Sequence, residues 1–400
     1  MSGQGRVRTD REALIMASLL LFTLLALTAA LGINPFLPSP FNSYTLQALA
    51  WRRGEASLAL NVPHLELAVY QSKLYVSFPP VPSVPIYLLT FLFGAAVPDG
   101  LLVKLYGLIA YFALYRLLRR CTWQPWQAAV TSFLLCTASS MLPLMLTGAV
   151  WYQAQVMAFM FTCLAIDGIY AGQPTRGLFF FALSIGCRPF NVLYGPLLIV
   201  CFLYSPNLRT VRLRDKLKAL VPGFLLGLCV ALAYGWYNFI RFDDPFEFGH
   251  NFLPEFSAQG GQQFALRHVL LNVPIFIFGL PFDGLQGPLT MTYSGFSLFL
   301  ANPILLLMPL WALRDTVQKK MSALMALTLS MCLLHLLLLL SHRTFGGFQY
   351  GARYAVDAIP YAAIYMVLRD QEAGFTKGFV FIMAIGLVMG ILGSLVIVLP

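Results

Sequence analysis

The stretch Ala13–Gly32, ALIMASLLLFTLLALTAALG, contains no charged residue, and Met321–Ser341, MSALMALTLSMCLLHLLLLLS, repeats this pattern far along the chain. Each has the roughly 20 apolar residues that a helix needs to cross a bilayer. The chain of 400 residues is 59% hydrophobic and only 10% charged, with a mean hydropathy of +0.75. This much apolar surface cannot be hidden in water, so the sequence predicts an all-α, polytopic membrane bundle of about ten to twelve spans.

The net charge of +10 comes from basic residues that gather in short loops between apolar runs. This distribution is the positive-inside signature, which predicts that these loops are cytoplasmic and argues against a nucleic-acid partner. The residues are Arg6, Arg8 and Arg11; Arg116, Arg119 and Arg120; Arg209, Arg212, Arg214, Lys216 and Lys218; Arg314, Lys319 and Lys320; and Arg369 and Lys377.

The 7 cysteines have no CxxC spacing, and most lie within or beside apolar runs. Cysteine in such places acts as a small hydrophobic residue. We therefore expect no disulfide and no zinc site. The first apolar run is too long for a removed signal peptide and lacks a small-x-small cleavage site, so we expect a signal anchor.

Placing the basic loops inside puts two long hydrophilic loops outside. The first external loop covers residues 34–99, and the second covers residues 241–293. Residues 83–97 are a short apolar run after a proline-rich segment, and we expect them to dip into the membrane and return; a full span over 83–98 is the alternative. The whole chain, 1–400, is then a single transmembrane domain with no soluble domain.

A second irregular segment, 176–204, is too long for one span and is interrupted by Arg188-Pro189. We expect two short or kinked helices whose junction faces outward. The apolar stretch Val269–Gly279 in the second loop is expected to lie at the membrane interface. We find no convincing internal repeat, which weighs against an inverted-repeat transporter.

Nearly all polar clusters outside the basic loops fall on the external side of this topology. They are His64, Glu66 and Lys73; Trp151, Tyr152 and Gln153; Arg188 and Asn191; Asp243, Asp244, Glu247 and His250; and Arg343, Arg353 and Asp357. Charge near lipid is costly, so these groups need partners or a wet cleft, and we expect one outward-facing cavity. A structural interpretation stays open, in which they decorate solvated loops or pair with one another, as Arg353 and Asp357 would at i, i+4 spacing.

Four short motifs follow one another along the chain. They are Leu65-Glu66 … Tyr70-Gln-Ser-Lys73-Leu-Tyr75-Val-Ser-Phe-Pro79-Pro80; Arg188-Pro189; Tyr237-Asn238-Phe-Ile-Arg241-Phe … Pro245-Phe-Glu247-Phe-Gly249; and Arg353-Tyr354 … Asp357 … Pro360. Together with the large first external loop, this order resembles the GT-C superfamily of integral-membrane glycosyltransferases, in particular a bacterial group. The resemblance covers most of the chain. It implies transfer of a sugar from a polyprenyl-phosphate carrier to a glycan, lipid or protein acceptor, on the periplasmic side of a bacterial inner membrane.

The chain departs from many GT-C enzymes in its acidic residues. Those enzymes carry Asp or an acidic pair in the first loop and a DxD-like motif in the second. Here the first loop offers Glu55 and Glu66, and no acid lies between Asp99 and Asp167. Because a divalent cation needs several oxygen ligands, we expect a metal-independent reaction without a cofactor, in which arginines supply the positive charge.

An inverting transfer needs a base for the acceptor hydroxyl and groups that stabilise the departing phosphate. Glu66 is the candidate base, because it lies in the loop that the resemblance marks and partial burial would raise its pKa. His64 is expected to orient Glu66 or to contact the phosphate. Arg188 and Arg353 are candidate donor-phosphate ligands, since a guanidinium can grip two phosphate oxygens at once, and Lys73 is a third candidate.

Six further residues are candidates for binding the sugar or the acceptor: Trp151, Tyr152, Gln153, Glu247, His250 and Asp357. Trp and Tyr can stack on a sugar face, although an ordinary interfacial belt also places them here. Two other functions stay open. A transporter or flippase for lipids or lipid-linked sugars would need a through-going pathway, and a noncatalytic lipid-binding subunit would use the same cavity without Glu66.

Overall fold

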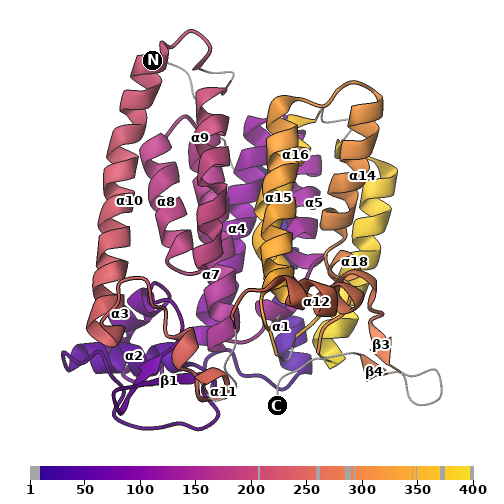
Figure 1. The fold of residues 1–400 in the computed structure, drawn as a ribbon. Coiled ribbons are helices and arrows are strands. Elements are labelled where there is room, and N and C mark those ends of the chain that lie inside the picture. The colour runs from indigo at the N-terminus through magenta and orange to yellow at the C-terminus, as the bar shows by residue number, and fades with distance from the viewer. Residues whose placement is uncertain are drawn as a thin grey trace.

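The computed structural model describes residues 10–205, 208–257, 262–283, 290–291, 294–344, 346–347, 349–369 and 374–396. In these ranges the chain forms a helical bundle with two short hairpins (Figure 1). Among the described residues, five helices are long and apolar enough to cross a membrane: α1 (Arg11–Ala30), α4 (Asp99–Arg120), α10 (Leu213–Phe242), α15 (Ala323–Ser341) and α18 (Lys377–Val396). The protein is an integral membrane protein, and the prediction of an all-α membrane bundle is confirmed.

The other helices of the bundle are shorter or interrupted. The apolar region between α4 and α7 is divided into α5 (Pro125–Thr137) and α6 (Met141–Leu144). Segment 176–204 forms α8 (Pro174–Ile185), the 3-10 helix η1 (Pro189–Tyr194) and α9 (Gly195–Leu203), and so breaks at Arg188-Pro189 as expected. The remaining elements are α7 (Val150–Tyr170), α13 (Leu298–Ala301), α14 (Pro303–Val317), the 3-10 helix η4 (Arg353–Ala358) and α16 (Ile359–Leu368). The number of crossings stays a prediction.

Helix α7 lies at the centre of the core. Nearly all of its side chains from Val150 to Ile169 are buried, and it packs against α4 and α8. Its approach to α8 depends on a pair of glycines, because a Cβ on Gly168 would lie only 2.9 Å from the backbone of Gly177. Small residues at such crossings let helices in a membrane come close enough for backbone packing.

The two ends of the bundle differ in character. In the orientation of Figure 1, the short connections after α4, α7, α9 and α14 lie at the top, and basic residues lie in these connections or in the helix ends beside them. The two long loops lie together at the bottom. Their elements are α2 (Ser43–Arg52), β1 (Leu67–Tyr70), β2 (Lys73–Val76) and α3 (Ser83–Phe93), then η3 (His250–Phe252), α11 (Pro254–Ser257), α12 (Leu266–Phe278), β3 (Phe282–Asp283) and β4 (Thr290–Met291).

The first long loop has its own local structure. Strand β1 pairs with β2 in an antiparallel hairpin, and the turn residues Gln71 (φ 47°) and Ser72 (φ 61°) are left-handed, as a tight two-residue turn requires. Helix α3 has 11 residues, about half of what a crossing needs. Whether α3 dips into the membrane stays a prediction.

Buried polar contacts fasten this loop to the bundle. Asp99, in the first turn of α4, accepts hydrogen bonds from the backbone N–H of Ser39 at 3.0 Å and from Asn42 Nδ2 at 2.7 Å. Arg241 at the end of α10 donates to the carbonyl of Val76 on β2 at 2.7 Å. These contacts connect the loop to two membrane-spanning helices, so its side chains have defined positions over the bundle.

Candidate active site

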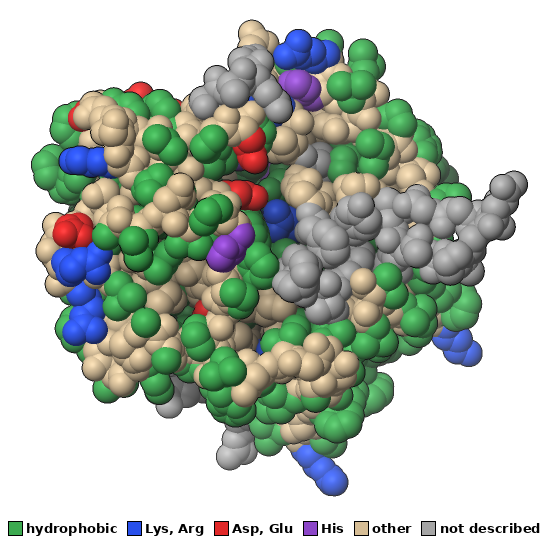
Figure 2. Space-filling model, turned by 90° about the horizontal axis from the view of Figure 1, so that it is seen from below, with side chains coloured by type: hydrophobic (Ala, Val, Ile, Leu, Met, Phe, Trp, Pro, Cys, Tyr) green, Lys and Arg blue, Asp and Glu red, His purple; other side chains and the backbone are tan. Residues whose placement is uncertain are grey.

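A cavity of about 380 Å³ opens at the loop end of the bundle. Its walls come from the segment after β2, the junction of α8 and η1, the loop after α10, the end of α15 and η4. Figure 2 shows acidic, basic and histidine side chains around a hollow on this face. Three of the predicted site residues, Arg188, Glu247 and His250, line this one cavity.

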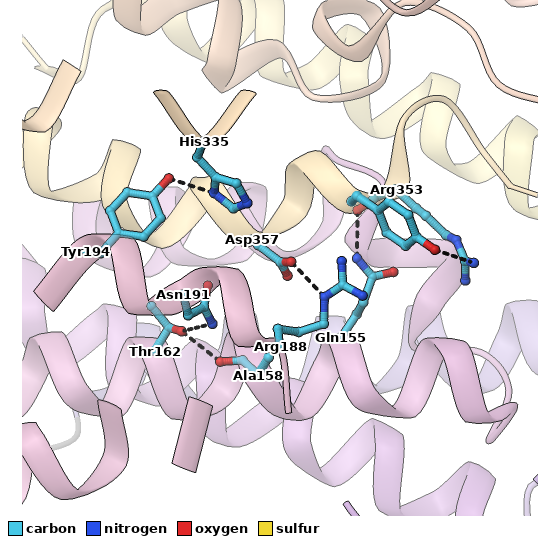
Figure 3. Close-up of polar contacts among 10 residues, drawn as sticks. Gln155, Ala158, Thr162, Arg188, Asn191, Tyr194, His335, Arg353 and Asp357 are labelled. Atoms are coloured by element: carbon cyan, nitrogen blue, oxygen red, sulfur yellow. Dashed lines mark hydrogen bonds and ion pairs between the residues drawn. The ribbon is translucent and has the colours of Figure 1, made fainter. Parts of the chain in front are cut away.

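Arg188 reaches the cavity because the chain breaks there. Pro189 disfavours helical geometry at the preceding residue, and Arg188 is extended (φ −141°, ψ 97°). Its Nε donates to Asp357 Oδ2 at 2.9 Å, with the Arg188 side chain 19% exposed and that of Asp357 1% exposed. Figure 3 shows the two side chains pointing toward each other from different elements. Asp357 Oδ1 has no hydrogen-bond partner within the described ranges.

The ion pair of Arg353 with Asp357 that helical spacing would allow is not formed among the described contacts; Asp357 pairs with Arg188 instead. The reason is the 3-10 geometry of η4. At three residues per turn, positions four apart no longer share a face.

Tyr354 lies between two guanidinium groups. Arg188 Cζ is 4.5 Å from the centre of its ring and Arg353 Cζ is 5.0 Å away, and both can be held there by cation–π attraction. Arg353 also lies 5.5 Å from the ring centre of Tyr152. Gln155 Nε2 donates to the Arg353 carbonyl at 3.0 Å. The two predicted phosphate ligands thus both lie near the Tyr354 ring. Gln155 positions the backbone of Arg353 (Figure 3).

Glu66 lies just before β1, half-buried. Burial raises the pKa of its carboxyl from the ordinary value of Glu, and Trp151 and Arg353 partly offset this by favouring the charged form. The buried indole N–H of Trp151 has no hydrogen bond of normal geometry in the described part of the chain. Glu66 is therefore a neighbour of Arg353 and Trp151. It does not itself line the cavity.

His64 and Lys73 lie outside this arrangement. A ring nitrogen of His64 is 3.0 Å from the carbonyl oxygen of Pro40, and the ring packs edge-on against Phe41. Lys73 is exposed at the start of β2, opposite Tyr70. Neither side chain is part of the cavity lining.

The consecutive residues Trp151, Tyr152 and Gln153 point in different directions. Trp151 packs against Phe41 in the first loop, and the ring of Tyr152 contacts the guanidinium of Arg353. Gln153 is completely buried and accepts a hydrogen bond from Asn42 at 3.0 Å. Gln153 therefore helps to hold Asn42, which also bonds to Asp99, and it does not line the cavity.

Glu247 and His250 come to the cavity from the loop after α10. The Glu247 carboxylate accepts hydrogen bonds from the backbone N–H of Gly249 at 2.7 Å and from Asn251 Nδ2 at 2.9 Å. His250 packs on Phe256 and His342. Burial, together with His342 and Arg343, lowers the pKa of His250 to about 4. His250 is thus neutral at neutral pH, and its buried Nε2 has no partner among the described atoms.

An apolar groove of about 720 Å³ lies between α8 and α10. Small residues such as Gly227 and Ala231 line it, together with larger aromatic ones. It shares Pro189, Phe246 and Phe248 with the cavity. Because these residues are the sequence neighbours of Arg188 and Glu247, the groove leads to the charged wall of the cavity.

The sequence pointed to Arg353 but not to Tyr354 and Gln155, which contact it. Tyr354 directly follows Arg353, and Gln155 is a polar residue within a helix of mainly apolar residues. His342, which lines the cavity and packs against His250, was also missed. Within the described ranges, no group of three or more His, Cys, Asp or Glu side chains is placed to hold a metal ion. Metal independence stays a prediction.

No protein-family profile matches the chain, and no curated protein does. Solved structures do match its fold. The archaeal oligosaccharyltransferase AglB from Archaeoglobus fulgidus, in complex with an inhibitory peptide and a dolichol-phosphate, aligns with a TM-score of 0.57 at 12% identity, over 96% of this chain and 56% of that chain. The apo form of the A. fulgidus oligosaccharyltransferase aligns with a TM-score of 0.55 at 13% identity, with the same coverage of both chains. ArnT from Cupriavidus metallidurans bound to undecaprenyl phosphate aligns with a TM-score of 0.49 at 14% identity, over 88% of this chain and 59% of that chain.

The chain spans just over half the length of the solved structures that it matches. The likeness to the oligosaccharyltransferase covers nearly all of this chain, from the first long loop through the bundle, at an identity that shows the fold alone. The expectation drawn from the four sequence motifs is confirmed at that level: this chain has the GT-C fold of integral-membrane glycosyltransferases.

Proposed function

We propose that this protein is a membrane glycosyltransferase that moves a sugar from a polyprenyl-phosphate carrier to an acceptor bound at the loop end of the bundle. The observation that carries the proposal is the apolar groove that meets the charged cavity at Pro189, Phe246 and Phe248. Apolar walls suit a polyprenyl chain, and Arg188 at the junction suits its phosphate. The aligned AglB structure contains a dolichol-phosphate, a ligand of this chemical class.

The reaction is an inverting substitution at the anomeric carbon of the sugar. Glu66 takes the proton of the acceptor hydroxyl, and the acceptor oxygen bonds to the anomeric carbon. The bond from that carbon to the phosphate oxygen breaks, and the polyprenyl phosphate leaves with the electron pair. Arg188 and Arg353, on either side of Tyr354, stabilise the charge that develops on the phosphate.

The remaining residues bind the sugar and the acceptor. Glu247 and neutral His250 line the same cavity as Arg188 and offer polar groups to sugar hydroxyls. Trp151, beside Glu66, offers an aromatic face, and its indole N–H has no hydrogen bond of normal geometry among the described residues. The basic residues at the other end of the bundle favour a periplasmic position for this cavity in a bacterial inner membrane.

Blocking the groove tests the proposal. Ala231→Trp places a large side chain among the groove residues and is expected to abolish turnover of polyprenyl-phosphate sugars. Leu228→Trp is the matched control, because Leu228 is 53% exposed on the same helix and does not line the groove. Both variants and the wild type are reconstituted in vesicles and assayed with a panel of polyprenyl-phosphate sugars. Equal turnover by the two variants would show that the groove does not bind the donor. Absence of turnover by the wild type with every donor in the panel would refute the proposed glycosyltransferase activity.

The pH dependence follows from the environment of Glu66. Burial raises its pKa from the ordinary value of Glu, and only the ionised form can act as a base. As pH falls through this raised pKa the base is protonated, so kcat/KM is expected to fall on an acid limb above the usual range of Glu. A rate profile between pH 4 and pH 8 measures this limb. The limb is expected to persist in Glu247→Gln; a profile that stays flat down to about 4.3, the pKa of an ordinary Glu, contradicts the assignment.

A further inference from the structure

At the end of the bundle opposite the cavity, one carboxylate holds three arginines. Asp167 on α7 is 3.3 Å from Arg116 Nε and 2.9 Å from Arg120 Nε, both on α4, and 2.8 Å from Arg176 Nη2 in the first turn of α8. The Asp167 side chain is completely buried, whereas Arg116 and Arg176 are each 35% exposed. Within this group of four side chains, two positive charges have no counter-charge.

A recess of about 550 Å³ begins beside this cluster and lies between α8 and α10. Its polar part is formed by Gln173, Thr175 and Arg176, and its apolar part by Phe179, Phe180 and Leu226. Helix α8 begins lower than α10 in Figure 1, so its first turn is set back from the basic end. Leu226 lies about 20 Å along α10 from the start of that helix. The recess therefore runs from a basic rim toward the part of the bundle that lies in lipid.

Arg176 keeps capacity for a further ligand. Its guanidinium donates to Asp167 through Nη2 and to Gln173 through Nη1 at 3.2 Å, whereas a guanidinium has five N–H donors. Its Cζ also lies 5.9 Å from the ring centre of Phe180. The same side chain thus borders both the charged cluster and the apolar wall.

We propose that this recess binds an anionic phospholipid of the surrounding membrane. The phosphate lies on Arg176 within the field of Arg116, the Thr175 hydroxyl contacts a headgroup oxygen, and one acyl chain lies along Phe179, Phe180 and Leu226. The excess positive charge selects an anion, and basic pockets between membrane helices favour acidic headgroups. The apolar wall selects a lipid over free phosphate, which gains nothing from it. This site does not depend on the proposed transfer reaction, since none of its lining residues lines the cavity or the apolar groove.

The test compares lipid binding by full-length protein in neutral detergent, measured by native mass spectrometry with phosphatidylglycerol or phosphatidylcholine. Arg176→Gln is expected to weaken phosphatidylglycerol binding about fivefold. The fold should survive, because Arg116 and Arg120 still neutralise Asp167. Leu226→Trp fills the apolar part at a side chain that is 43% exposed, and it should weaken binding without a change in charge. Arg214→Gln, at an exposed arginine near the start of α10, is the charge-matched control.

Selective binding of phosphatidylglycerol, reduced by Arg176→Gln and Leu226→Trp but not by Arg214→Gln, supports the site. Equal binding of the two lipids overturns it. Equal losses in Arg176→Gln and Arg214→Gln also overturn it, because they indicate diffuse attraction to a basic surface. If millimolar inorganic phosphate displaces the lipid and Leu226→Trp binds phosphatidylglycerol as well as wild type does, the recess binds a free anion. This result would refute the proposed lipid site.

Discussion

Glu66→Gln is expected to lower the rate of sugar transfer by about a hundredfold to ten-thousandfold, the usual contribution of a positioned general base. The amide keeps the shape of the side chain beside Trp151 and Arg353 but cannot accept a proton. Stability should not fall, because burial already opposes the charge on this carboxyl. The measurement is a single-turnover rate with donor bound in advance, so that loss of binding and loss of chemistry are separated.

Glu247→Gln is the matched control for that variant. Glu247 is a predicted site carboxylate that lines the cavity, and its oxygens already accept hydrogen bonds from Gly249 and Asn251. We expect a small loss of rate from a change in sugar binding. A Glu66→Gln rate within tenfold of wild type would reject Glu66 as the base. Glu247 would then be the next candidate, ahead of Asp357, which is tied to Arg188.

Much of the fold could be predicted from local features of the sequence. Long apolar runs such as Ala13–Gly32 specify membrane helices because the backbone must satisfy its own hydrogen bonds in lipid. The break at Arg188-Pro189 follows from the missing N–H of proline. The interruption between α5 and α6 was not predicted, since the apolar run continues across it and only tertiary packing separates the two helices.

The site was harder to predict than the fold. The side of the membrane on which polar loops gather follows from the basic loops, but the pairing of Arg188 with Asp357 joins positions 169 residues apart. Gln153 was assigned with Trp151 and Tyr152 by adjacency alone. Consecutive residues on an α-helix project about 100° apart. Trp151 therefore contacts the first loop, Tyr152 contacts Arg353, and Gln153 bonds to the buried Asn42.

Arg188→Lys is expected to weaken binding of a polyprenyl phosphate by about tenfold to a hundredfold, the value of a charge-assisted hydrogen bond. Lysine keeps the charge but offers a single ammonium, which cannot bond Asp357 and span two phosphate oxygens as a guanidinium can. Arg353→Lys should act in the same direction from the other side of Tyr354. Affinity is measured with the unsugared carrier phosphate, so that the result does not depend on which sugar the enzyme takes.

Stability separates this role from a structural one. Arg188→Ala alone leaves the Asp357 carboxylate buried without its partner, which should cost about 3–5 kcal/mol of unfolding free energy. Adding Asp357→Ala removes the stranded charge, and the double variant should recover a large part of that loss. Its affinity for the carrier phosphate should stay low, because the phosphate ligand is still absent. If the double variant binds the carrier like wild type, Arg188 serves only to neutralise Asp357, and the phosphate must be held elsewhere in the cavity.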